Sequence, residues 1–186
     1  MRSGAAASSP EKQGPLSFRL LPELADLGSQ AELTGSLTEE CIRKGSLELR
    51  LPQGIAYRLQ LTNTGSGVVL SGSAHAQAVT ECSRCLEEAR IDLDADVECY
   101  YVLRPRDSEL ATADDEVVLV GVDGCVDLRE PIIAALVFET PVAILCRSDC
   151  AGLCPHCGAD LNDGACGCAN EVDPSHPLAA LRQLIQ

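Results

Sequence analysis

Residues 91–101 read IDLDADVECYY, and their alternation of apolar and polar side chains decides how this part of the chain folds. Alternation with a period of two is typical of a β-strand that buries one face. The carboxylates of Asp92, Asp94, Asp96 and Glu98 then form a row on the opposite face. We therefore expect a half-buried strand with an acidic exposed face.

The same pattern predicts further strands around this one. Alternation covers residues 47–51 and 55–61, which are linked by turn residues at 52–54, and an extended segment follows over 68–80. One more strand is expected over residues 117–122.

A helix is expected over residues 128–139. Asp127 can cap its start, Glu130 completes a pattern similar to a capping box, and Pro131 is tolerated in a first turn. Pro141 cannot continue a helix and is expected to end this one.

These elements predict an α+β fold, in which an antiparallel β-sheet with one or two helices is followed by a cysteine-rich, zinc-binding C-terminal module. The second helix is expected to begin at residues 173–174. The expected organisation is a flexible tail over residues 1–15, an α+β domain over 16–145, and the cysteine-rich module with its helix over 146–186.

The charge distribution bears on possible partners. The 186 residues carry a net charge of −14, and residues 81–130 hold fifteen acidic against five basic side chains. Arg43 and Lys44 are the sole adjacent basic pair, and the chain has no Trp, so it lacks a basic groove and a base-stacking surface. We therefore expect no strong direct binding of RNA, and instead a basic protein partner.

The chain lacks features of a membrane or secreted protein. Its longest apolar run, residues 132–138, is far shorter than the roughly 20 residues of a membrane span. Residues 1–15 lack the charged-then-apolar pattern of a signal peptide. The sequence therefore predicts a cytoplasmic protein without a membrane partner.

Eleven cysteines are the second unusual feature of the composition. An odd number without a secretion signal argues against a disulfide framework. Six of them lie between residues 146 and 168, among glycines, prolines and aspartates. This clustering indicates a metal site.

Two Cys-x-x-Cys pairs carry the metal prediction. In Cys154-Pro-His-Cys157-Gly158, two thiolates can turn onto one tetrahedral ion, and Cys166 and Cys168 can close the site. The other pair, Cys82 and Cys85, could be a redox pair, but it lies between two expected strands rather than at a helix start.

Counting allows two sites of four cysteines. One set is Cys82, Cys85, Cys146 and Cys150, and the other is Cys154, Cys157, Cys166 and Cys168. The sequence leaves the pairing open, and a single metal is the alternative. Thiolate ligands favour zinc, with an iron–sulfur cluster as the other possibility. We expect one or two zinc ions.

The remaining candidates have simpler interpretations. Cys41, Cys99 and Cys125 lack spaced partners and are expected to be buried. His156 and His176 are substitute ligands that eight cysteines make unnecessary. Motifs for hydrolases and phosphate-binding loops are missing, so no enzyme activity is expected.

These residues resemble a known family. Cys82-Ser-Arg-Cys85-Leu86, Leu145-Cys146, the run from Asp149 to Asn162, Cys166-Gly-Cys168 and Asp173-Pro174 are similar to motifs of the YceD family (DUF177), over roughly residues 20–186. After Asp-Pro the chain has Ser175-His176-Pro177 where family members carry Arg. The resemblance implies a part in the accumulation of 23S rRNA in the large ribosomal subunit.

We accordingly expect a non-catalytic factor that supports large-subunit biogenesis. Its expected partner is a basic ribosomal protein of the large subunit, or an assembly intermediate, held by Asp92, Asp94, Asp96 and Glu98. A zinc- and thiol-based redox sensor is the alternative function. An RNA-processing enzyme would need an open metal position or a carboxylate cluster that the sequence does not contain.

Overall fold

The computed structural model describes residues 16–19, 24, 26–102, 117–119 and 125–168. The chain divides into two compact units. The sheet unit comprises residues 1–80 and 90–142, and the cysteine unit comprises residues 81–89 and 143–186. Residues 81–89, expected within the domain of residues 16–145, thus group with the C-terminal cysteines. The expected tail over residues 1–15 and the expected terminal helix from residues 173–174 lie outside the described residues.

The strands and the helix follow one another in this order: β1 Ser17–Arg19, β2 Gln30–Leu37, β3 Cys41–Lys44, β4 Leu47–Arg50, β5 Ile55–Asn63, β6 Gly67–Glu81, β7 Glu88–Val102, β8 Val117–Leu119, β9 Cys125–Asp127 and α1 Arg129–Glu139. The α+β prediction of a mostly antiparallel sheet with one helix is confirmed for the described residues.

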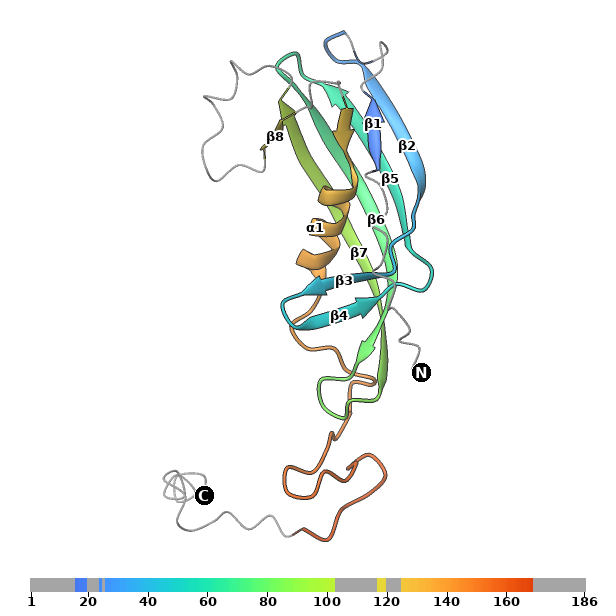
Figure 1. The fold of residues 1–186 in the computed structure, drawn as a ribbon, viewed down its shortest axis with the longest axis vertical. Helices are drawn as coiled ribbons and strands as arrows, with labels where there is room; N and C mark the ends of the chain where they lie inside the picture. The colour runs from blue at the N-terminus through green and yellow to red at the C-terminus, as the bar shows by residue number, and fades with distance from the viewer. Residues whose placement is uncertain (1–15, 20–23, 25, 103–116, 120–124, 169–186) are drawn as a thin grey trace, which may run out of the picture. The chain divides into compact units, whose positions relative to one another are not determined.

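The main sheet is built around β6. In Figure 1, β2, β5, β6 and β7 run side by side. β4 pairs with β6 at Val79, near the C-terminal end of β6, and β3 pairs with β4. The pairs β2–β5, β3–β4, β4–β6 and β5–β6 are antiparallel, whereas β7 and β8 are parallel, with Tyr100 opposite Val117. A separate two-stranded sheet pairs β1 with β9.

The expected acidic strand is β7, and its alternation is confirmed. Leu93, Ala95 and Val97 are buried, while the acidic side chains between them are exposed. The neighbouring strand β6 contains Gly72, where an added Cβ would lie 2.2 Å from the carbonyl oxygen of Arg58 on β5. Glycine is therefore needed at this position, where the two paired strands approach each other closely.

The strands expected over residues 47–51 and 55–61 are present as β4 and β5. They do not pair with each other, because β4 pairs with β3 and β6 while β5 pairs with β2 and β6. The strands β2 and β3 were not predicted. Small residues such as Ala31 and Gly35 occupy the inward positions of β2, so its hydrophobic alternation is weak.

The helix α1 begins one residue later than the predicted cap requires. Leu128 stands at the N-cap without a side-chain hydrogen bond, because Asp127 still pairs with Ser17 at the end of β9. Asp127 Oδ1 nevertheless accepts a hydrogen bond from Arg129 N at 2.8 Å. The helix buries Ile132 and Leu136 and packs against β3.

Candidate metal centres

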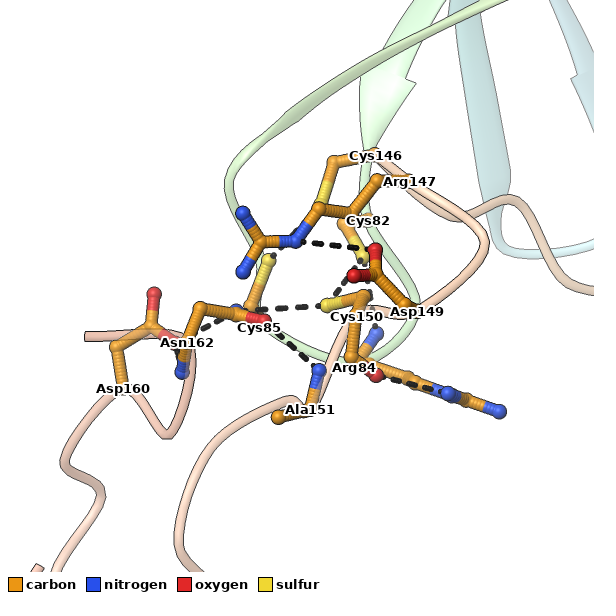
Figure 2. Close-up of polar contacts among 10 residues, drawn as sticks. All are labelled: Cys82, Arg84, Cys85, Cys146, Arg147, Asp149, Cys150, Ala151, Asp160 and Asn162. Atoms are coloured by element: carbon orange, nitrogen blue, oxygen red, sulfur yellow. Dashed lines mark hydrogen bonds and ion pairs between the residues drawn. The ribbon is translucent and has the colours of Figure 1, made fainter. Parts of the chain in front are cut away.

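The loop between β6 and β7 contributes two cysteines to the first cluster. Cys82 and Cys85 meet Cys146 and Cys150, and all four sulfur atoms lie within 4.8 Å of one another. Figure 2 shows these side chains converging. Two of the sulfur separations are 3.8 Å, from Cys82 to Cys150, and 3.6 Å, from Cys85 to Cys146. A tetrahedral zinc with bonds of about 2.3 Å places its sulfur ligands about 3.8 Å apart.

The second cluster comes entirely from the C-terminal segment. It comprises Cys154, Cys157, Cys166 and Cys168, again with sulfur atoms within 4.8 Å of one another. The structure thus brings the eight predicted cysteines together in the two sets of four that counting allowed, and each set could hold a metal ion.

The two Cys-x-x-Cys turns share one backbone geometry. In each, the first cysteine donates its N–H to the carbonyl five residues later, and its own carbonyl accepts from the N–H four residues later. These bonds are Cys82 N to Glu87 O at 2.7 Å, Leu86 N to Cys82 O at 3.0 Å, Cys154 N to Ala159 O at 2.8 Å, and Gly158 N to Cys154 O at 2.9 Å. The chain therefore curls in the same way around both candidate ions.

The backbone of each turn stabilises one thiolate. Backbone hydrogen bonds, from Cys85 above all, lower the pKa of Cys82 to about 6. Backbone hydrogen bonds from Cys157 and His156 likewise lower the pKa of Cys154 to about 6. In both turns the first cysteine is thus prepared to bind as a thiolate.

Cys85, Cys146 and Cys168 have raised pKa values instead. For Cys85 a backbone hydrogen bond from Glu87 lowers the pKa, but desolvation and the adjacent thiols outweigh it and raise the pKa to about 12. The neighbouring thiol of Cys157 and desolvation raise the pKa of Cys168 to about 12. Desolvation also raises the pKa of Cys146. Several thiolates can therefore coexist in one cluster only beside a cation.

No sequence pattern indicated the residues that bring the first cluster together. Ser83 N donates to Ile144 O at 2.8 Å, and Ile144 N donates to Ser83 Oγ at 3.1 Å. Arg84 Nη1 donates to Cys150 O at 2.8 Å, and Leu153 N donates to Arg84 O at 3.1 Å. The two residues inside the first turn thus hold the chain that contributes Cys146 and Cys150.

The predicted carboxylate row lies on the exposed face of β7. Asp94 Oδ1 lies 2.8 Å from His75 Nδ1 on β6, and Asp92 Oδ1 accepts from Gln77 Nε2 at 3.3 Å. Asp96 and Glu98 are exposed and make no hydrogen bond or ion pair with the residues that the structure describes. The row is accessible to solvent along its length.

Both members of the basic pair, Arg43 and Lys44, make contacts within the chain. Arg43 forms an ion pair with Glu48 at 2.6 Å, and Lys44 Nζ donates to Thr140 O at 2.5 Å. Of the unclustered cysteines, Cys99 is buried as expected, whereas Cys41 and Cys125 are half-buried. His176 lies outside the described residues.

In the part of the chain that the structure describes, α1 is the one helix, and its 11 residues are too few to cross a lipid bilayer.

Comparison with known proteins adds a family match. The model of the family described as large ribosomal RNA subunit accumulation protein YceD matches residues 70–185. This match covers most of β6, all of β7 and all eight clustered cysteines.

The similar curated proteins are mycobacterial. Uncharacterized proteins of Mycobacterium tuberculosis and Mycobacterium bovis are each 34% identical over 116 residues, which is 62% of this chain and 56% of theirs. One of Mycobacterium leprae is 34% identical over 119 residues, which is 64% of this chain and 50% of its own. The chain thus spans about half the length of the curated relatives it matches. No solved structure matches it.

Proposed function

The chain belongs to the YceD family of large ribosomal RNA subunit accumulation proteins, and from this premise we propose that it is a non-catalytic factor for 23S rRNA accumulation and large-subunit biogenesis. It acts in the cytoplasm, where thiols stay reduced and available to metal. Its role is to bind a basic ribosomal protein of the large subunit.

Zinc is the proposed ion in both clusters. Four thiolates around one zinc leave no open coordination position for water or substrate, so such a site stabilises the fold and does not hydrolyse. The clusters do not favour a redox sensor over this role, because their geometry equally suits a structural ion. Each zinc with four thiolates carries a net charge of −2 and adds to the acidity of the chain.

The exposed carboxylate row on β7 is the observation that carries the proposed partner. Its successive side chains lie on one face of a rigid strand, with Asp96 and Glu98 free of internal partners among the described residues. A row of this kind attracts Lys- and Arg-rich segments and repels nucleic acid phosphates. Any effect on rRNA therefore passes through a protein.

The test replaces the row with neutral side chains. A variant carrying Asp92→Asn, Asp94→Asn, Asp96→Asn and Glu98→Gln should capture less basic ribosomal protein from a purified large-subunit protein mixture. Its capture should also depend less on salt, because fewer exposed charges take part. Cells that depend on this variant should contain less 23S rRNA.

A matched control removes the same charge elsewhere. Asp26→Asn, Glu40→Gln, Glu139→Gln and Asp163→Asn change four exposed side chains outside the row. This control should bind and support rRNA as the wild type does. Equal loss in both variants would show that net charge alone matters, and tight RNA binding by the wild-type protein at physiological salt would overturn the proposal.

A further inference from the structure

Asn162 connects the two cysteine clusters. It lies in the loop between Cys157 and Cys166 of the second cluster, yet its Nδ2 donates to Cys150 Sγ of the first cluster at 3.5 Å. Its Oδ1 accepts from Ala151 N at 2.8 Å, next to Cys150. Figure 2 shows the amide of Asn162 directed at this part of the first cluster.

The orientation of this amide is determined by its neighbour. Asp160 Oδ1 accepts from both the backbone N of Asn162 at 2.8 Å and its Nδ2 at 2.7 Å. The side chain is thereby held with its nitrogen toward the sulfur and its oxygen toward Ala151 N. Asn162 is half-buried, and its bonds to Cys150 Sγ and Asp160 are partly shielded from water, while its bond to Ala151 N is exposed.

The backbone links the same two segments. Leu161 N donates to Gly152 O at 2.8 Å, and Leu153 pairs with Asp160 in an isolated antiparallel bridge. The loop of the second cluster therefore packs against residues 150–153, which carry the last ligand of the first cluster. Order in the loop and order around Cys150 depend on each other.

We propose that Asn162 is a positioning residue that couples the two metal sites. This inference rests on the proposal that both clusters hold metal. An ion in the second cluster orders the 157–166 loop and holds the Asn162 amide against the Cys150 thiolate. The hydrogen bond stabilises that thiolate as a ligand, so the first cluster retains its ion more strongly when the second is filled. The coupling is reciprocal, as linkage requires.

Transfer of zinc from the full chain to a chromogenic chelator tests the coupling. Asn162→Asp keeps the oxygen that accepts from Ala151 N and replaces the donor nitrogen with an anionic oxygen. Zinc should leave the first cluster roughly tenfold faster, the lower range for loss of a hydrogen bond to a metal ligand. Asp163→Asn, an exposed change in the same loop, should release zinc at the wild-type rate.

A cobalt-loaded protein separates hydrogen bonding from packing. The thiolate-to-cobalt charge-transfer band of the first cluster should shift in Asn162→Asp and stay in place in Asp163→Asn. If Asn162→Ala releases metal faster while Asn162→Asp behaves as the wild type, the contact with Ala151 matters and the donor role is wrong.

Emptying the second cluster tests whether an ion there makes the first cluster retain its own ion more strongly. The double variant Cys166→Ser, Cys168→Ser should retain one ion, in the first cluster, and release it faster than the wild type releases its first-cluster ion. Adding Asn162→Asp to this variant should then change the release rate little. Release of the remaining ion at the rate of the wild-type first-cluster ion would overturn the coupling. A wild-type chain that contains less than about half an equivalent of metal would instead overturn metal binding by the clusters.

Discussion

At the scale of single residues, Leu86 and Gly158 occupy equivalent positions after their Cys-x-x-Cys pairs. Both adopt left-handed backbone geometry, with φ of 66° and 73° respectively. Glycine adopts this geometry freely, whereas a leucine costs roughly 1–2 kcal/mol. Leu86 is 60% exposed, so burial of its side chain offsets little of this cost. The first turn therefore carries backbone strain that the second avoids.

We predict that Gly158→Ala lowers the free energy of local opening at the second turn by roughly 1–2 kcal/mol. No atom lies within 4 Å of the added Cβ, so the loss reflects backbone strain alone. Leu86→Gly should leave the first turn unchanged or stabilise it by up to about 1 kcal/mol, because released strain and glycine entropy oppose each other. Native-state hydrogen exchange of the Gly158 and residue-86 amides measures both effects.

Gly167→Ala is the control for this comparison. Gly167 lies outside the left-handed region, and its added Cβ also meets nothing within 4 Å. Its exchange rates should match those of the wild type. If Gly158→Ala and the wild type are equally protected from hydrogen exchange, the predicted backbone strain of an alanine at position 158 is wrong.

At the scale of secondary structure, β3 stabilises the end of α1 through one lysine. Lys44 Nζ donates to the carbonyls of Thr140 at 2.5 Å and Phe138 at 3.4 Å. These carbonyls lie at the negative end of the helix dipole, and no basic residue stands in the last turn of α1 itself. Lys44, one member of the basic pair noted in the sequence, thus links the end of the helix to β3.

We predict that Lys44→Met lowers the free energy of unfolding by about 1 kcal/mol, since it removes a charged donor from a helix C-terminus. Arg43→Met provides the control on the adjacent residue. Arg43 pairs with Glu48 at an exposed site, and its loss should lower the free energy of unfolding less than the loss of Lys44 does. Urea unfolding followed by circular dichroism compares them, and equal stability of the two variants would contradict the proposed role of Lys44.

At the scale of the whole molecule, the two units have different cores. The sheet unit buries large aliphatic side chains, including Leu49, Ile55, Leu59 and Leu70. In the cysteine unit, Ile144 is the sole large aliphatic side chain buried among the described residues, beside Ala89 and four cysteines. The sheet unit therefore has a hydrophobic core of its own, whereas we expect the cysteine unit to depend on bound metal for its stability.

We predict that the purified chain contains one to two equivalents of zinc by elemental analysis. A strong chelator should make residues 146–168 sensitive to protease, while the circular dichroism of the sheet persists. Cys154→Ser should have the same local effect without chelator, and the half-buried Cys41→Ser should not. Unchanged proteolysis after complete metal removal would show that the clusters do not stabilise this unit.

How much of the fold was predictable depends on how strongly each segment alternates. The apolar positions of β6 and β7 alternate over long stretches, and both strands were predicted close to their observed bounds. In β2, alanine and glycine weaken the signal. The cap of α1 was misplaced because Asp127 also belongs to β9, whose pairing with β1 no local pattern indicates.

The sequence by itself determined the eight clustered cysteines, the two Cys-x-x-Cys turns and the acidic row, because all three follow from spacing along a short segment. Tertiary structure decided which cysteines meet. Cys85 and Cys146 are separated by 61 residues, and Cys82 and Cys150 by 68. The hydrogen bonds between Ser83 and Ile144 and between Arg84 and Cys150 bring these segments together. Such contacts depend on how the whole chain closes, and local spacing carries no information about them.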